Sequence, residues 1–272
     1  MNNLTKRIIS AIVYGVLFIG CSIYSGYTLM IFLTFILTLA LTETYHLSNF
    51  TSSIVLKLIH HFFGVLFFFF VSLGFLSRTY EILAFSIVPI ILSPIVCLFL
   101  SKNDFVNQLS RFLFSFLYPS LGISALFALG FAFNPSQYNP ALILSVLVLI
   151  WANDTFAYFT GMIFGKHKLA ETISPKKTWE GLFGGLIFTV IISLVIHHFY
   201  HSLIEPVSLG IVIVISGTLG DLIESKWKRE AGVKDSGTIM PGHGGIFDRI
   251  DSIVLVAPVV FVYLYFFKIL NL

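Results

Sequence analysis

Acidic residues are followed directly by basic ones at the end of the eighth apolar segment. If a helix continues through this stretch, its polar residues share one face at i, i+3, i+4 and i+7, namely Asp221, Glu224, Ser225 and Lys228. Such a face can hold a cation next to an anionic group. A self-neutralising surface helix has the same composition, but Asp221 lies where the apolar run has barely ended. We therefore treat this face as a candidate site for charged chemistry.

A glycine-rich connection, residues 241–245, leads into a second pair of carboxylates. Glycines let the backbone approach a ligand closely, and Asp248 and Asp251 project to one side at the start of the last helix. Mg²⁺ is usually held by one or two carboxylates plus substrate phosphates, and the chain has no Cys and His cluster for Zn²⁺. Arg249 is equally suited to pair with either aspartate, and His243 to cap a turn.

Another carboxylate, Asp154, lies inside the sixth apolar segment. A charged group at the centre of a membrane helix costs about 2.5–3.5 kcal/mol on insertion scales, so it normally faces a polar cavity. Asp154 is therefore a candidate functional residue. A packing hydrogen bond shared with Asn153 and Thr155 is the alternative.

A lysine pair precedes the seventh apolar segment. Pro175 ends one element, and a Ser or Thr ahead of Glu180 is suited to cap the next helix. Lys176 and Lys177 beside the free N–H groups of a helix start form an anion site suited to phosphate. A lysine pair beside a membrane is as often an interface anchor, so this segment alone leaves both interpretations open.

These residues belong to a mostly apolar chain. It has 272 residues, of which 57% are hydrophobic and 11% charged, with a mean hydropathy of +0.95. Soluble proteins have about 45–50% apolar and about 25% charged residues. Apolar runs near the roughly 20 residues that span a bilayer recur along the whole length. The sequence therefore predicts an all-α, polytopic transmembrane helical bundle of about nine spans, at residues 7–25, 27–47, 54–76, 82–101, 109–133, 140–164, 179–200, 206–225 and 252–271.

The basic residues indicate the orientation. With a cytoplasmic N-terminus, only Arg78 and Lys268 of the 16 basic residues fall outside, which predicts an N-in, C-out topology. The cations concentrate in residues 165–178 and 226–250, more than this bias alone requires, and indicate an anionic ligand. We expect residues 1–138 to form N-terminal membrane scaffold helices, and residues 139–272 to form catalytic membrane helices with two cytoplasmic connections.

Residues 225–251 closely resemble the signature of the phosphatidate cytidylyltransferases, also called CDP-diacylglycerol synthases. The residues of that signature fall on Ser225, Lys228-Arg229, Lys234-Asp235, His243-Gly244-Gly245 and Asp248-Arg249-Ile250-Asp251. Trp227 and Met240 depart mildly from its usual apolar residues. The segments Asn153-Asp154 and Ser174-Pro175-Lys176-Lys177-Thr178 also resemble this family, so the resemblance extends from residue 153 onward.

The resemblance implies a nucleotidyltransferase of phospholipid biosynthesis that condenses CTP with phosphatidate to CDP-diacylglycerol and pyrophosphate. The main obstacle to this reaction is the repulsion between two polyanionic substrates, and metal ions and cationic side chains reduce that repulsion. We expect Mg²⁺ as cofactor, a second cation being compatible, with Asp221, Asp248 and Asp251 as metal ligands. Catalytic roles are expected for these three and Lys228. Substrate binding is expected of Ser174, Lys176, Lys177, Thr178, Arg229, Lys234, His243 and Arg249.

The expected partners are CTP, phosphatidate and the lipid bilayer, with no nucleic acid; a homodimer is compatible with the sequence. The expected location is the inner, cytoplasmic membrane of a bacterium, with the active site facing the cytoplasm. An ion-coupled secondary transporter is the alternative, which explains Asp154 and helices broken near Gly and Pro but not the connection at 226–250. Transfer of a phosphoalcohol from a CDP-lipid also uses Asp clusters and Mg²⁺, but the order of motifs here does not resemble that family's.

Overall fold

The protein is a bundle of long apolar helices. The computed structural model describes residues 3–50, 53–100, 104–200, 205–239 and 244–270, and 81% of the chain is helical. Eight segments of the described chain are long and apolar enough to cross a membrane, and the apolar stretch Ile9–Tyr24 of α1 adds a shorter one. The prediction of a polytopic transmembrane helical bundle is therefore confirmed, and the protein is an integral membrane protein.

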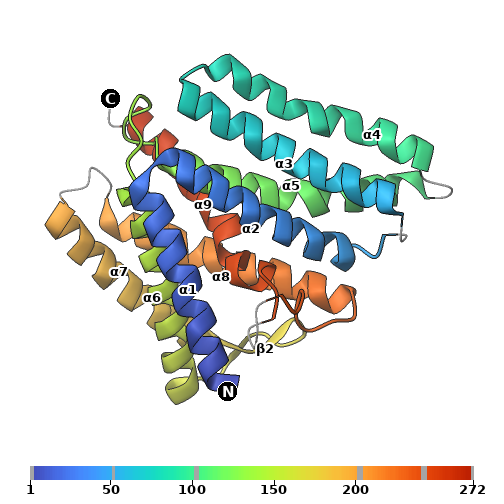
Figure 1. The fold of residues 1–272 in the computed structure, drawn as a ribbon. Helices are drawn as coiled ribbons and strands as arrows, with labels where there is room; N and C mark the ends of the chain where they lie inside the picture. Colours follow the sequence, from blue (N-terminus) through green and yellow to red (C-terminus); the bar gives the residue numbers. More distant parts are fainter. Residues whose placement is uncertain (1–2, 51–52, 101–103, 201–204, 240–243, 271–272) are drawn as a thin grey trace.

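The elements follow one another along the chain with short connections (Figure 1). In order they are α1 (Asn3–Tyr24), α2 (Gly26–Leu47), α3 (Ile54–Ser77), the 3-10 helix η1 (Tyr80–Ile87), α4 (Val88–Leu100), α5 (Phe105–Leu129), α6 (Ala141–Phe164), β1 (Lys168–Ala170), β2 (Ser174–Thr178), α7 (Trp179–Tyr200), α8 (Pro206–Glu230) and α9 (Phe247–Leu270).

Side chains next to several helix starts satisfy the free backbone N–H groups there. Ser25 and Thr28 form a reciprocal capping box at α2, and Glu205 caps α8 directly before Pro206. At α7, the hydroxyl of Thr178 accepts a hydrogen bond from the Gly181 N–H at 3.1 Å. The predicted cap ahead of Glu180 is therefore confirmed.

The helices near the polar connections are longer than their apolar cores. α8 continues to Glu230, past the end of the predicted span at residue 225. α9 begins at Phe247, ahead of the predicted span start at 252 but in agreement with the prediction that Asp248 and Asp251 lie at the start of the last helix. Hydropathy detects only the part of a helix that lies in lipid, whereas the backbone hydrogen bonds continue into polar turns. This extension keeps Lys228 on the same helix as Asp221, as the candidate face requires.

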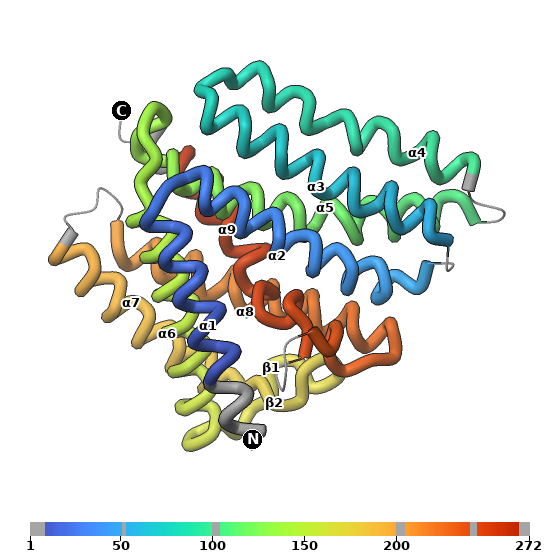
Figure 2. The backbone as a smooth tube through the Cα atoms, in the orientation of Figure 1, coloured from blue at the N-terminus to red at the C-terminus, as the bar shows by residue number. Residues whose placement is uncertain are grey.

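A short antiparallel hairpin is the one exception to the all-α prediction in the described chain. β1 and β2 pair Lys168 with Thr178 and Ala170 with Ser174, within the basic connection between α6 and α7. Figure 2 shows this hairpin at the end of the bundle where α1 begins. The hairpin presents the lysines of β2 beside the start of α7.

Helix α9 packs against helices from both parts of the chain. Its main partners are α8 and α5. A Cβ at Gly122 of α5 would meet the carbonyl oxygen of Val254 at 2.6 Å, so this glycine permits the close approach of α5 and α9. The division of the chain near residue 138 stays a prediction, and helices from its two sides share one core.

Candidate active site

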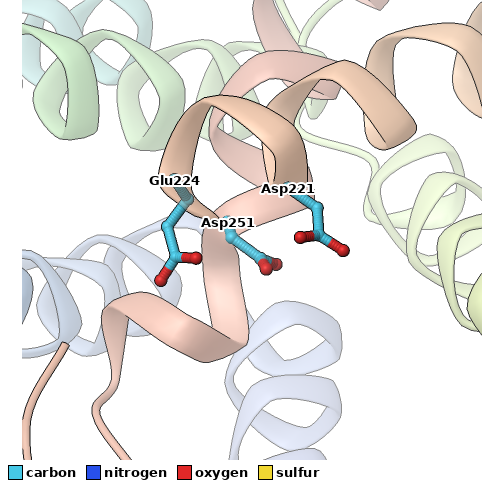
Figure 3. Close-up of side chains that lie close together, drawn as sticks. All are labelled: Asp221, Glu224 and Asp251. Atoms are coloured by element: carbon cyan, nitrogen blue, oxygen red, sulfur yellow. The ribbon is translucent and has the colours of Figure 1, made fainter. Parts of the chain in front are cut away.

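Helices α8 and α9 bring three carboxylates together. One oxygen from each of Asp221, Glu224 and Asp251 lies within 4.8 Å of the others. Figure 3 shows that Asp221 and Glu224 project from α8 toward the space that Asp251 enters from α9. The helices approach closely because Gly220 has no side chain, and a Cβ there would meet the carbonyl oxygen of Asp251 at 2.8 Å. We call Asp221, Glu224 and Asp251 the carboxylate triad.

Two lysines and one hydroxyl group hold the two α8 members of the triad. Lys177 of β2 places its Nζ 2.7 Å from Oδ2 of Asp221, and Ser225 donates its hydroxyl to Oδ1 at 3.1 Å. Glu224 is fully buried, and its Oε2 lies 2.5 Å from Nζ of Lys228. Its Oε1 has no hydrogen-bond partner within the described chain.

Asp248 lies beside the triad and is held by nitrogen donors. Its carboxylate accepts hydrogen bonds from Lys228 Nζ at 2.7 Å, from the Ser236 N–H at 3.0 Å and from the Gly245 N–H at 2.7 Å. Lys228 thus bridges Asp248 and Glu224. The start of α9 at Phe247 places Asp248 and Asp251 in its first turns, as the i, i+3 spacing predicts.

The donor set fits a hard divalent cation. The triad offers only oxygen ligands, and a buried acceptor, Oε1 of Glu224, has no other partner among the described residues. Five carboxyl groups gather here, Asp154, Asp221, Glu224, Asp248 and Asp251. The ion pairs found among the described residues of this region involve Lys177 and Lys228, and Arg249 lines the second cavity beside four of the carboxyl groups. Carboxylates in excess of their cationic partners are stabilised by a bound cation such as Mg²⁺.

Two cavities meet at the carboxylates. The first, of about 530 Å³, is lined on one side by β1 and β2, including Lys168, Lys176 and Lys177. The second, of about 690 Å³, has an apolar wall on α1, from Ala11 to Ile19, and a polar wall on α8 and α9. Asp154 and Asp221 line both cavities. A cavity lined by three lysines and a cavity with an apolar wall on α1 therefore share two acidic residues.

The other predicted site residues are spread more widely. Arg249 lines the second cavity, and Arg229 donates to the carbonyl oxygen of Val233 at 3.2 Å on the exposed end of α8. Lys234 is exposed, Ser174 pairs with Ala170 at the start of β2, and His243 lies outside the described residues.

Glu224 is the triad member that was not among the predicted metal ligands, although the sequence places it on the same helix face as Asp221. The i, i+3 spacing from Asp221 was the available signal. Asp154 is next to Asn153, whose Nδ2 lies 3.5 Å from its Oδ1, and it also faces both cavities. Asp154 therefore has the predicted contact with Asn153 and also a position on both cavities, and its functional role stays a prediction.

Comparison with known proteins identifies relatives of this chain. The sequence profile described as the cytidylyltransferase family matches residues 5–267. A phosphatidate cytidylyltransferase of Haemophilus influenzae is 42% identical over 177 residues, which cover 62% of this chain and 60% of that protein. Proteins of the same name from Staphylococcus aureus and Staphylococcus epidermidis are 42% and 40% identical over 163 residues, 58% of this chain and 60% of each relative. The chain therefore matches about 60% of the length of these relatives.

Proposed function

Because this chain belongs to the cytidylyltransferase family, we propose that it is a phosphatidate cytidylyltransferase, which condenses CTP with phosphatidate to CDP-diacylglycerol and pyrophosphate. The observation that carries the proposal is the meeting of a basic and an apolar cavity at Asp154 and Asp221. One substrate is a water-soluble polyanion and the other is an anionic amphiphile. Each cavity matches one of them.

The first cavity is suited to the triphosphate of CTP. Lys168, Lys176 and Lys177 give it positive charge on one wall, and the hairpin that carries them lies outside the apolar spans. The second cavity is suited to phosphatidate, because its α1 wall of Ala11, Ile12, Val16 and Ile19 can contact acyl chains while Arg249 faces the phosphate. The reacting groups then meet at the carboxylates.

The reaction balances without an added base. An oxygen of the phosphatidate phosphate forms a bond to the α-phosphorus of CTP, and the bond from that phosphorus to the bridging oxygen breaks with its electron pair leaving on pyrophosphate. The nucleophile is already an anion, so the obstacle is charge repulsion. Mg²⁺, when bound by the triad with Asp248 close by, would supply positive charge at these phosphates. Lys177 and Lys228 would orient the carboxylates and neutralise phosphate charge.

Asp248 is proposed as a direct Mg²⁺ ligand on the resemblance, and as the holder of Lys228 on its contacts. In the second role it fixes the ammonium group between itself and Glu224. Ser174, Thr178, Arg229, Lys234 and His243 complete the proposed substrate-binding set. Of these, Thr178 acts by starting α7 beside the first cavity.

The proposed setting is the inner membrane of a bacterium, N-terminus inside, with the carboxylates facing the cytoplasm. Its support is the concentration of basic residues in the two polar connections and the positions of the helix ends: α1 begins at one end of the bundle and α9 ends at the other (Figure 1). A second copy of the chain as partner stays a prediction.

The test is a reconstituted reaction. Purified protein in detergent is mixed with CTP, phosphatidate and Mg²⁺, and pyrophosphate release is measured together with the lipid product. We expect equal amounts of pyrophosphate and CDP-diacylglycerol, and neither product when the lipid or the metal is left out. A protein that forms no CDP-lipid but moves an ion-coupled solute across vesicles without CTP would overturn the proposal in favour of a transporter.

A further inference from the structure

A buried glutamate on α2 lies far from the carboxylates in sequence but contacts the segment that carries one of them. Glu43 is 3% exposed, in a helix whose other described side chains are mostly apolar. A carboxylate inside a membrane helix is costly unless it has partners. The described chain shows no lysine or arginine paired with Glu43, so its stabilisation comes from hydrogen-bond donors.

Those donors belong to the start of α9 and the connection before it. Oε1 of Glu43 accepts the Ile246 N–H at 2.9 Å, and Oε2 accepts the Phe247 N–H and the Ser236 hydroxyl, both at 2.8 Å. The first N–H groups of a helix have no partner within it and favour negative charge. Glu43 therefore caps α9 from another helix.

The same two stretches of backbone also hold Asp248. The Ser236 N–H and the Gly245 N–H both donate to its carboxylate, at 3.0 and 2.7 Å. Glu43 and Asp248 thus bind residues 236 and 245–247 between them. Asp248 in turn pairs with Lys228, and Lys228 pairs with Glu224 of the triad. A continuous set of contacts joins α2 to the triad.

Two glycines show that the connection closes tightly around the Glu43 carboxylate. A Cβ at Gly237 would lie 2.6 Å from Oε1 of Glu43, and a Cβ at Gly245 would also meet this carboxylate. Real Cβ atoms do not approach oxygen this closely, so a side chain at either position would displace the Glu43 carboxylate. Glycine at 237 and 245 is therefore what lets the backbone surround Glu43.

We propose that Glu43 is a positioning residue for the reaction, which sets the place of Asp248 and Lys228 by fixing the start of α9 and the connection before it. The inference rests on the proposed function for its kinetic consequence, but the anchoring itself does not. Glu43 touches neither cavity, so its loss should affect turnover and leave substrate affinity largely unchanged.

The experiment compares Glu43→Gln with Glu81→Gln, a matched change at an exposed glutamate of η1. The amide keeps the size of the side chain but turns an NH₂ group toward N–H donors. We expect kcat to fall at least about tenfold, with KM for CTP and phosphatidate within about twofold and a higher Mg²⁺ concentration for half-maximal rate. Glu81→Gln should match the unmodified protein.

A milder variant covers the case in which Glu43→Gln does not fold. Ser236→Ala removes one of the three hydrogen bonds to Glu43 and leaves the backbone N–H that Asp248 accepts. We expect a smaller fall in kcat of the same kind, and a double variant no slower than Glu43→Gln, because both changes act through one contact. Independent multiplicative effects, or an unchanged kcat and Mg²⁺ dependence, would show that Glu43 serves stability alone.

Hydrogen exchange gives a readout that does not need the reaction. The amides of Ile246 and Phe247 should exchange faster in Glu43→Gln and remain slow in Glu81→Gln. Unchanged exchange at these amides would overturn the anchor. If the unmodified protein forms no CDP-diacylglycerol while the amides respond as expected, the proposed function fails and the anchor stands.

Discussion

We expect the replacement of two neighbouring aspartates of α9 by Asn to have opposite effects on stability, because only one of them belongs to the carboxylate triad. Asp251 belongs to the triad, and its only described donor is the adjacent Ser252 N–H at 2.7 Å. Asp248 is held by Lys228 and two backbone N–H groups. Replacing each with Asn removes one negative charge at nearly constant volume. The two variants therefore form a matched pair one helical turn apart.

Without metal, Asp251→Asn should be at least as stable as the unmodified protein. The ligand oxygens of the triad lie within 4.8 Å of one another, and two ionised carboxylates at that upper limit repel by roughly 3 kcal/mol at an effective dielectric constant of about 20. Asp251→Asn removes this repulsion within the triad. Asp248→Asn should instead lower the free energy of unfolding by about 1–3 kcal/mol, because a buried N–H donor loses its acceptor.

Asp251→Asn should weaken Mg²⁺ binding and lower turnover, although it does not lower stability in the absence of metal. Saturation at about 100 times the dissociation constant contributes about 2.7 kcal/mol of stability, so the rise in melting temperature with Mg²⁺ should be lost. If the metal contributes about 3–4 kcal/mol to the transition state, turnover falls by about 10²–10³-fold.

The assay records melting temperature in EDTA and across a Mg²⁺ series, together with pyrophosphate release. A Mg²⁺-dependent rise in melting temperature that survives in Asp251→Asn, with near-normal turnover, would place the metal elsewhere. Equal melting temperatures for both variants in EDTA would show that Asp248 is not held by the donors described above.

Three further outcomes are expected. Lys177→Met should raise the KM for CTP about ten- to hundredfold, because a charge-assisted contact in the first cavity is lost, whereas Lys226→Met, at an exposed pair with Glu230, should stay within about twofold. Gly15→Leu, on the α1 wall of the second cavity, should raise the KM for phosphatidate about tenfold and leave that for CTP unchanged, while Gly20→Leu, outside that wall, should alter neither. In a Cys21→Ala/Cys97→Ala background, an impermeant thiol reagent should label Ser136→Cys from outside the cell and reach Thr172→Cys only after the membrane is opened, and the reverse pattern would invert the proposed orientation.

The bundle could be predicted from the sequence because lipid imposes a strong length and composition constraint on each span. Helix ends were less predictable, since α8 and α9 extend into polar turns that hydropathy does not score. The hairpin of β1 and β2 was missed for a different reason. Its strands are short and hold lysines and Pro175, so neither alternation nor β-branched residues mark them.

The spacing of residues within each helix predicts the carboxylate pairs on α8 and on α9. It does not predict which carboxylates of the two helices come together. Asp221 and Glu224 share a face by helical periodicity, and Figure 3 shows them on one side of α8. Asp248 and Asp251, predicted to project to one side, both line the second cavity. The triad, however, takes Glu224 from one helix and Asp251 from the other. Which members meet depends on the contact of α8 and α9 at Gly220, which no short-range pattern encodes.

Glu43 belongs to the N-terminal helices, for which the sequence predicts only a scaffold role. The cost of a buried carboxylate, which identified Asp154, applies equally to Glu43, but no neighbouring motif indicates what it binds. Its donors come from residues 236, 246 and 247, which lie 193 to 204 positions further along the chain. The glycines at 237 and 245 belong to the connection that carries the motif. Both lie against the carboxylate of Glu43 on α2, where a Cβ would collide with it. In this chain, part of the segment at residues 234–251 that resembles the family therefore fits around Glu43.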